Sequence, residues 1–417
     1  MDTVAWLYGL QKLGVKLGLD GIRALLEIAD RPDRAFPSIL VAGTNGKGSV
    51  AAMLDAMLRA SGRRTGLYTS PHLVRPNERI RIDGADVDDA TLEAGLARVR
   101  AYCELGLADA RLAAHPSFFE VMTVAALESF RDARVDVAVL EVGLGGRLDA
   151  TNATEPVAGV ITTIGIDHVA QLGASLESIA AEKAHVARKG RPLVTGVTQP
   201  APLGVIRDHA RAVGALLVEA HAATLPVDPG EVGLSGAHQR DNARVALVAF
   251  ERLAAEIGLS PDPRAMREGL RSVRWPARLQ WIDGRPAILV DGAHNEDGAQ
   301  ALAAHLDGLR RGRPVLLCAA MRDKDPARIL GPIVARSAAV VVARPGVERA
   351  ADPEELAARL AHPGLPVEAC AEVGAALRRA CELAGPTGWV LVAGSLYLAG
   401  DVLRTLQGGE GAGPVAM

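Results

Sequence analysis

The chain has 417 residues, of which 49% are hydrophobic and 23% are charged, and its formal net charge at pH 7 is −3. This length exceeds one ordinary hydrophobic core and predicts at least two domains. The small negative charge gives no reason to expect nucleic acid or an anionic membrane surface as a partner. No apolar run approaches the ~20 residues of a membrane span, and the four cysteines lack C-x-x-C spacing. We therefore expect a cytoplasmic protein with reduced thiols and no membrane partner.

A glycine-rich segment between a predicted strand (residues 38–42) and a predicted helix (residues 50–58) is the strongest local motif. It reads G-T-N-G-K-G-S over residues 43–49. Backbone N–H groups, the helix N-terminus and the charge of Lys47 together favour phosphate binding. The usual G-x-x-x-x-G-K-[S/T] pattern is not met, because Val41 and Gly48 stand where a glycine and a hydroxyl belong. A tight turn without a ligand is the alternative, but this composition exceeds what a turn requires, so we predict a nucleotide site.

Polar residues follow two further predicted strands. The apolar run 136–142 carries Glu141 near its end, and the strand 157–163 leads to His168. Ligands of open α/β sheets bind outside the carboxyl ends of the strands, and a carboxylate near a phosphate loop suggests a magnesium ligand. A helix-capping or salt-bridged glutamate and a structural histidine are the alternatives. The polar loop 69–80, which contains two prolines, is predicted to be functional, with a solvated connector as its alternative.

Lysine is scarce in this chain, in which nearly all basic residues are arginine. The lysines are Lys12, Lys16, Lys47, Lys183, Lys189 and Lys324. A lysine inside a motif of such a chain is favoured where a compact, titratable ammonium is needed. Lys47, Lys183 and Lys324 all lie in such surroundings.

Alternating strands and helices predict an α/β protein with two domains and mostly parallel sheets. We expect a first, nucleotide-binding domain over residues 1–274, a linker over residues 275–286, and a smaller Rossmann-like α/β domain over residues 287–417. Strands are predicted in the second domain over residues 287–290, 315–318, 338–343 and 389–392. The second domain has no glycine-rich loop of its own.

Seven stretches resemble, in the same order, motifs of the folylpolyglutamate synthase/dihydrofolate synthase family of the Mur ligase superfamily. They are residues 43–49, 69–73, 77–80, 141–152, 165–168, 182–184 and 291–295. Each stretch is a modest signal, but the set spans nearly the whole chain and is highly specific. The family's phosphate loop reads G-T-N-G-K-G-S, which accounts for the departure from the usual pattern. The resemblance implies a P-loop, Mur ligase-like ATPase domain followed by the Rossmann-like domain.

The resemblance also implies roles for residues of the first domain. It implies that the phosphates of ATP are held by Thr44, Asn45, Gly46, Lys47, Gly48 and Ser49. The implied magnesium ligands are Ser70, Glu141 and His168. Lys183 matches a lysine that family members carry as a carbamate, an anion able to bind a second magnesium. Two Mg²⁺ sites and a carbamylated Lys183 are therefore expected.

Further roles follow from the same resemblance. Asn242, Arg278 and Asp291 match the adenine, phosphate and ribose contacts of ATP, so the nucleotide is expected between the domains. His294 is expected to face the reacting centre. The implied substrate contacts are Phe119, Asp149 and Ala150 for dihydropteroate or folate, and Arg79 and Ser395 for L-glutamate.

The implied reaction is ATP-dependent formation of an amide. A pteroate or folate carboxylate attacks the γ-phosphate of ATP to give an acyl phosphate and ADP, and the amine of glutamate then displaces phosphate. The motif over residues 147–152 favours the bifunctional enzyme, with a dedicated folylpolyglutamate synthase as the alternative. Another Mur-type amino-acid ligase and a non-enzymatic ATP-dependent switch or scaffold are the other interpretations. A monomer is expected from the resemblance alone.

Overall fold

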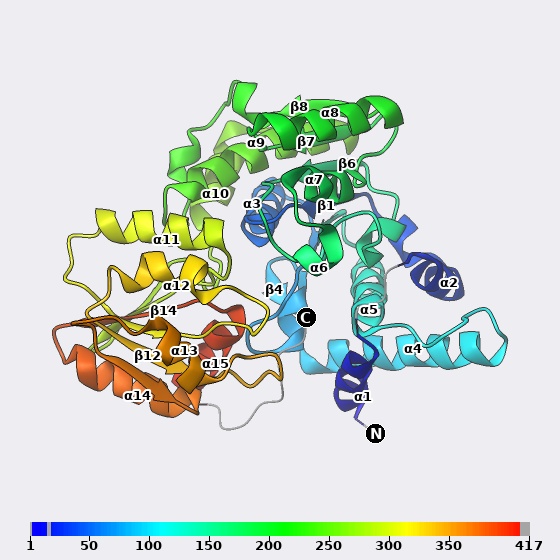
Figure 1. The fold of residues 1–417 in the computed structure, drawn as a ribbon. Coiled ribbons are helices and arrows are strands. Elements are labelled where there is room, and N and C mark those ends of the chain that lie inside the picture. The colour runs from blue at the N-terminus through cyan, green and yellow to red at the C-terminus, as the bar shows by residue number, and fades with distance from the viewer. Residues whose placement is uncertain (1, 15–17, 409–417) are drawn as a thin grey trace.

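The structure, a computed structural model, describes residues 2–14 and 18–408, which form two α/β domains (Figure 1). The first domain is coloured blue to green and the second yellow to red. Within the described residues, no helix is both long and apolar enough to cross a membrane.

The first domain is built on an eight-stranded sheet with the order β4-β3-β2-β5-β1-β6-β7-β8. The strands from β2 to β8 in this order run parallel, while β3 and β4 extend the β2 edge as an antiparallel ribbon. The strands are β1 (Ser38–Ala42), β2 (Thr65–Tyr68), β3 (Ile80–Ile82), β4 (Ala85–Asp86), β5 (Val137–Glu141), β6 (Ala158–Ile161), β7 (Pro192–Thr195) and β8 (Leu216–Glu219). Strand β1 lies between β5 and β6, so three strand ends meet at the glycine-rich segment.

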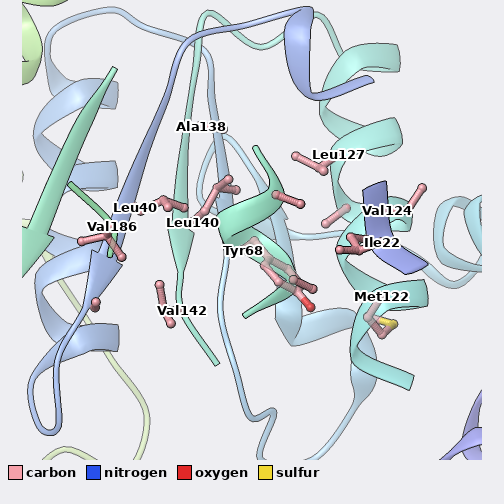
Figure 2. Close-up of a cluster of buried hydrophobic side chains, with 14 of the residues drawn as sticks. Ile22, Leu40, Tyr68, Met122, Val124, Leu127, Ala138, Leu140, Val142 and Val186 are labelled. Atoms are coloured by element: carbon pink, nitrogen blue, oxygen red, sulfur yellow. The ribbon is translucent and has the colours of Figure 1, made fainter. Parts of the chain in front are cut away.

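Helices cover both faces of this sheet, because alternate residues of a strand point to opposite sides. Ile39 and Val41 pack against α3 (Lys47–Ala60), α9 (His238–Glu256) and α10 (Pro263–Ser272). Leu40 and Ala42 belong to the opposite cluster, in which Figure 2 shows Tyr68 between Leu140 on the sheet and Met122 on the neighbouring helix. The helices of that face are α1 (Thr3–Gly9), α2 (Asp20–Ile28), α4 (Asp89–Ala108), α5 (Phe118–Asp132), α7 (Leu176–Ala184) and α8 (Pro200–Val213).

Short helical turns connect these elements. One α-helical turn, α6 (Val169–Leu172), directly follows His168. The 3₁₀ segments are η1 (Leu10–Leu13), η2 (Pro32–Arg34), η3 (Pro76–Arg79), η4 (Ala150–Ala153), η5 (Ala220–Ala222) and η6 (Pro229–Glu231). Two of these turns, η3 and η4, end or begin within predicted site motifs.

The second domain is built on a six-stranded sheet with the order β13-β12-β11-β14-β10-β9, parallel except for β9. Its strands are β9 (Gln280–Ile282), β10 (Ala287–Val290), β11 (Val315–Cys318), β12 (Ala339–Ala343), β13 (Val367–Cys370) and β14 (Trp389–Ala393). One face packs against α14 (Val373–Ala384) and α15 (Leu396–Leu406). The other packs against α11 (Glu296–Gly308), α12 (Pro326–Val334) and α13 (Pro353–Leu360).

The two-domain α/β architecture with mostly parallel sheets agrees with the fold class predicted from the sequence. The segment 275–286, predicted as a linker, contains β9, which pairs with β10 through Trp281 and Leu289. This part of the segment therefore belongs to the second sheet. It was not recognised because three residues are too few to show a period-2 pattern.

One loop of the first domain is buried in the core of the second. Leu73 is only 8% exposed and belongs to the cluster formed by β10, β11, β14 and α15. The approach is close, because a Cβ atom added at Gly400 would lie 2.1 Å from the carbonyl oxygen of Leu73. The domains are thus joined by an apolar contact as well as by the chain itself.

Candidate active site

A cavity of about 1550 Å³ lies between the domains and is lined by residues of both. The carboxyl ends of β1, β5 and β6 open into it from the first domain, and those of β10, β11 and β14 from the second. All the predicted site residues line this cavity except Arg79. The sequence motifs therefore converge on one place in the fold.

The glycine-rich loop is held in shape by the end of β6. The N–H of Thr44 donates to the carbonyl oxygen of Thr163 at 2.8 Å, and the N–H of Asn45 donates to Thr163 Oγ1 at 3.0 Å. Thr162 Oγ1 donates to the carbonyl oxygen of Asn45 at 2.6 Å. Lys47 Nζ reaches back to the carbonyl oxygen of Thr44 at 3.2 Å. The loop is thus preformed at the start of α3, whose first N–H groups have no partner within the helix.

Gly46 has a positive φ of 84° and caps α3. A Cβ atom there would lie 2.3 Å from Asn242 Oδ1, so α9 packs tightly against the loop. Asn242 Nδ2 donates to Gln239 Oε1 at 3.0 Å, and Gln239 Nε2 donates to Ser49 Oγ at 3.4 Å. Gln239 was not predicted, although its position three residues before Asn242 on a helix places both on one face.

Glu141 ends β5 and is buried next to the loop that carries Ser70. Its Oε2 accepts a hydrogen bond from the N–H of Ser70 at 3.1 Å. Burial raises the pKa of Glu141, while the charge of Lys47 opposes this shift. Glu141 and Ser70, predicted from separate motifs, thus lie in direct contact.

His168 begins α6 in a left-handed conformation with φ of 50°, and its N–H is held by Asp167 Oδ1 at 2.8 Å. Burial lowers the pKa of His168 to about 4, against the attraction of Asp167. The imidazole is therefore neutral at pH 7, which is the form that binds metals.

Ser70, Glu141 and His168 fit a magnesium ion only if a bound nucleotide supplies further ligands. No group of three or more His, Cys, Asp or Glu side chains in the described parts of the chain is arranged to hold a metal. Mg²⁺ is usually held by one or two carboxylates, water and the phosphates of its substrate. One carboxylate, one imidazole and one hydroxyl beside a phosphate loop match that kind of site.

Lys183 lies near the end of α7 and is only 4% exposed. Burial lowers its pKa to about 7, and the nearby charge of Lys47 acts in the same direction. A substantial fraction of the Lys183 side chains is therefore a neutral amine near pH 7. The neutral amine is the form that reacts with electrophiles.

A polar cluster joins the domains at Asp167. This carboxylate pairs with Lys324 and accepts a hydrogen bond from Asn295 Nδ2 at 3.2 Å. Asn295 Nδ2 also donates to Asn45 Oδ1 at 2.9 Å. Burial alone would raise the pKa of Asp167, but Lys324 and, in the acidic range where both imidazoles are protonated, His294 and His168 hold this pKa below its usual range. The pairing with Lys324 was not predicted, although the scarcity of lysine marked that residue.

His294 lies at the same junction, 3.7 Å from Asp167 through its Nε2 atom. Its Nδ1 is 2.8 Å from the carbonyl oxygen of Gly292 and therefore carries the hydrogen. Burial lowers the pKa of His294, so its Nε2 is an unprotonated acceptor at neutral pH.

Asp291 organises the turn after β10. Its two carboxylate oxygens accept hydrogen bonds from the N–H groups of Leu279 and Ala293, each at 2.9 Å. The neighbouring Arg278 donates to the carbonyl oxygen of Ala277 at 3.0 Å. Arg278 and Asp291, both predicted to contact the nucleotide, line the cavity. The carboxylate of Asp291 already accepts hydrogen bonds from two backbone N–H groups.

Arg79, implied by the resemblance as a glutamate contact, is the one predicted site residue that does not line the cavity. It is fully buried, donates to His72 Nδ1 at 2.8 Å and lies 5.0 Å from the ring of Phe118. Burial lowers its pKa. Arg79 is thus held by the protein core and does not line the cavity.

The residues predicted to contact the pteroate or folate acceptor line the cavity from the first domain. Phe119 follows Ser117, whose side chain caps α5, and packs against Tyr68 with ring centroids 5.9 Å apart. Asp149 caps η4 and accepts from the N–H groups of Leu144 at 2.9 Å and Thr151 at 3.0 Å. Ala150 follows at the cavity wall.

Ser395 caps α15 of the second domain, where its Oγ accepts from the N–H groups of Tyr397 and Leu398. It is 2% exposed but lines the cavity. The hydroxyl oxygen thus accepts hydrogen bonds from the helix backbone, and its O–H remains available as a donor to a ligand in the cavity.

Two domain families match the chain. The Mur ligase middle domain matches residues 41–197, and the glutamate ligase domain of Mur ligases matches residues 277–396. A dihydrofolate synthase/folylpolyglutamate synthase of Bacillus subtilis is 36% identical over 345 residues, covering 78% of this chain and 80% of that protein. A probable bifunctional folylpolyglutamate synthase/dihydropteroate synthase of Haloferax volcanii is 39% identical over 97% of this chain, which spans only 50% of that relative.

Solved structures resemble both domains together. A folylpolyglutamate synthase of Mycobacterium tuberculosis complexed with ADP and AMPPCP gives a TM-score of 0.87 at 33% identity, covering 99% of this chain and 100% of that one. A bifunctional folylpolyglutamate synthase/dihydrofolate synthase with Mn, AMPPNP and L-glutamate bound gives 0.85 at 31% identity over 98% of each chain. Escherichia coli FolC in complex with DHPP and ADP gives 0.83 at 30% identity over 98% of each chain.

Proposed function

Because the chain belongs to the folylpolyglutamate synthase/dihydrofolate synthase family of Mur ligases, we propose that it is an ATP-dependent ligase that adds L-glutamate to dihydropteroate and to reduced folates. The observation that carries this proposal is the single cavity that joins a preformed phosphate loop in one domain to His294 and Ser395 in the other. A ligase of this kind must hold a nucleotide, an acyl acceptor and an amine within reach of each other. One interdomain cavity meets that need.

The reaction has two steps. In the first, a carboxylate oxygen of the pteroate or folate attacks the γ-phosphorus of ATP, forming an acyl phosphate and releasing ADP. Lys47, placed at the start of α3, offsets the negative charge of the transferring phosphoryl group. In the second, the amine of glutamate attacks the acyl carbon, phosphate leaves and an amide forms.

The second step requires the amine of glutamate to lose a proton. His294 Nε2 is an unprotonated acceptor, because the hydrogen of the neutral ring is held on Nδ1 by Gly292. Asp167, 3.7 Å from Nε2, stabilises the imidazolium that forms. The proposal assigns proton acceptance to His294 and its stabilisation to Asp167.

We propose that Ser70, Glu141 and His168 hold one Mg²⁺ with the nucleotide, and that Lys183 as a carbamate holds a second. Bound magnesium would supply charge neutralisation on the phosphates of ATP. The carbamate forms from a neutral lysine amine and CO₂, and the burial that lowers the pKa of Lys183 favours that amine. This reaction would release one proton and leave an anion next to Lys47.

Exclusion of water is the second function of the cavity, because an acyl phosphate is rapidly hydrolysed if water reaches it. The contacts of Asn295 with Asn45 and Asp167 bring the second domain onto the phosphate loop. We propose that the domains part to admit substrates and that these contacts form again on closure.

The dual activity rests on Phe119, Asp149 and Ala150, which line the cavity in the first domain. The similarity to FolC complexed with DHPP and ADP supports a pteroate-type acceptor. Asp149 would act mainly by shaping the wall, since its carboxylate caps η4. We further propose that the enzyme is monomeric and cytoplasmic, with its four cysteines as free thiols.

The test is phosphate release from ATP with glutamate and either dihydropteroate or tetrahydrofolate, each substrate being omitted in turn. Release with either acceptor, dependent on glutamate, supports the bifunctional ligase. Release with tetrahydrofolate alone replaces it with a dedicated folylpolyglutamate synthase. ATP binding without release in any mixture overturns the ligase and favours a switch or scaffold.

A further inference from the structure

Two arginines of the second domain line the cavity and have none of the roles assigned above. Arg322 follows β11 and Arg349 follows β12, which are neighbouring parallel strands. The N–H of Arg322 donates to the carbonyl oxygen of Arg349 at 3.0 Å, and Arg322 Nε donates to that of Ala350 at 3.1 Å. These backbone contacts fix the two arginines beside each other at the cavity wall.

Tyr397 orients the guanidinium group of Arg349. The Tyr397 hydroxyl accepts a hydrogen bond from a terminal nitrogen of Arg349 at 3.1 Å, and the guanidinium carbon lies 5.3 Å from the ring centroid. Tyr397 is only 6% exposed, so its ring is fixed by packing. Arg349 thus contacts the first turn of α15, the helix capped by Ser395, the residue predicted to contact glutamate, and both line the same cavity.

Neither Arg322 nor Arg349 forms an ion pair with a carboxylate of the described residues. Their sequence neighbours Asp323 and Glu348 also line the cavity, but pair with neither arginine. Nearby cations are neutralised within the protein: Lys324 pairs with Asp167, and Arg404 pairs with Asp401 at 2.7 Å. Two exposed guanidinium groups on a cavity wall, one of them oriented, offer the planar fork that binds carboxylates.

We propose that Arg322 and Arg349, positioned by Tyr397, form a subsite that binds a carboxylate of a glutamyl group during ligation. This inference rests on the proposed function, since that reaction supplies two sources of such a carboxylate. One source is the incoming glutamate, and the other is the terminal part of a γ-glutamyl chain on the folate. Arg79, which the resemblance implies as a glutamate contact, is fully buried and does not line the cavity, whereas these two arginines do.

The test compares Arg349→Gln with Arg344→Gln, an exposed arginine at the end of the same strand that does not line the cavity. Wild-type ligation with glutamate and tetrahydrofolate is measured first, and its absence would overturn the proposed function rather than the subsite. KM is then measured for glutamate, for ATP, and for monoglutamyl and triglutamyl tetrahydrofolate. We expect Arg349→Gln to raise one carboxylate KM roughly 10- to 100-fold, while the KM for ATP and all values for Arg344→Gln stay unchanged.

The pattern of KM changes identifies which carboxylate the subsite binds. A rise in the KM for glutamate assigns the subsite to the incoming amino acid, and a rise confined to the triglutamyl substrate assigns it to the chain. Arg349→Lys should recover part of the loss, because it keeps the charge without the planar fork. Tyr397→Phe removes only the orienting hydroxyl, and it should raise the KM that Arg349→Gln raises, by a smaller factor. This variant provides the test if Arg349→Gln does not fold. Unchanged carboxylate KM values in folded variants would overturn the proposal.

Discussion

The two halves of the cavity are built in different ways. In the first domain the functional side chains are enclosed: Ser49, Lys183 and Glu141 are 1%, 4% and 5% exposed. In the second domain Ser395 is equally buried, but Arg322 and Arg349 are exposed, and the Lys324 side chain is 21% exposed. The first half acts on phosphates that are identical in every turnover, so a rigid, preformed arrangement suits it.

The second half faces the substrates that enter and leave. Its polar contacts with the first half are few, and they centre on Asp167 and Asn45. Substitutions in the first half should therefore slow the chemical step, whereas those in the second, apart from His294, should change substrate binding or the coupling of the domains.

The largest effect is expected for Lys47→Ala. Removal of the ammonium from the phosphate loop should lower kcat roughly 10²- to 10³-fold, because a preorganised charge on the transferring group is lost. Phosphate release and circular dichroism together test this expectation. Lys189→Ala, at an exposed lysine far from the loop in sequence, is the control. Near-normal kcat in a folded Lys47→Ala variant would contradict the role of the loop.

The next largest effect is expected for Lys183→Ala. If the carbamate holds a metal, this variant should lose most of its activity and recover part of it with added short carboxylates that enter the space of the side chain. Mass spectrometry under CO₂ tests for the modification itself. Full activity of the variant without additives would remove Lys183 from the mechanism.

A smaller effect is expected for Lys324→Met, which removes the cation from Asp167. Asp167 would remain buried without a cation of full charge, keeping His294, Asn295 and the N–H of His168 as partners, and kcat/KM should fall roughly tenfold. Arg328→Met is the matched control, because it breaks a surface ion pair with Glu296 in the same domain. Equal losses in both variants would show that the interdomain contact has no special importance.

The smallest effect on chemistry is expected for Gly400→Ala. The added Cβ atom would meet the carbonyl oxygen of Leu73, so the packing between α15 and the Ser70 loop must shift, at about 1–3 kcal/mol of stability. Thermal unfolding measures this loss. Gly204→Ala, in α8 with no atom near the added group, should instead stabilise the protein by up to about 1 kcal/mol. A neutral Gly400→Ala would mean that the domains adjust freely at this contact.

The central strands could be predicted from the sequence because their burial on both faces gives continuous apolar runs. Strand β1, every residue of which is buried, is typical. Strand β8, which is half-exposed at the sheet edge, and β13 were not predicted, because partial exposure removes that signal. The position of Glu141 followed from the rule that ligands bind at the ends of parallel strands.

Contacts between residues far apart in sequence could not be predicted in this way. Lys324 and Asp167 are 157 positions apart, and Asn295 and Asn45 are 250 apart, so no local pattern relates them. The burial of Arg79 was equally hidden, because it depends on His72 and Phe118 closing over the guanidinium group. The sequence motif indicated a functional residue, but it did not show that the side chain is buried and does not line the cavity.

The burial of Leu73 in the second domain has a consequence for the order in which the protein matures. The loop that carries Ser70 and Leu73 is synthesised early, whereas α15 lies near the end of the described chain. Leu73 can therefore pack against α15 only after most of the second domain has been synthesised. The phosphate loop, held by Thr162 and Thr163, is complete much earlier. A nascent chain thus completes the phosphate loop before Leu73 can pack against α15, the last helix of the described residues.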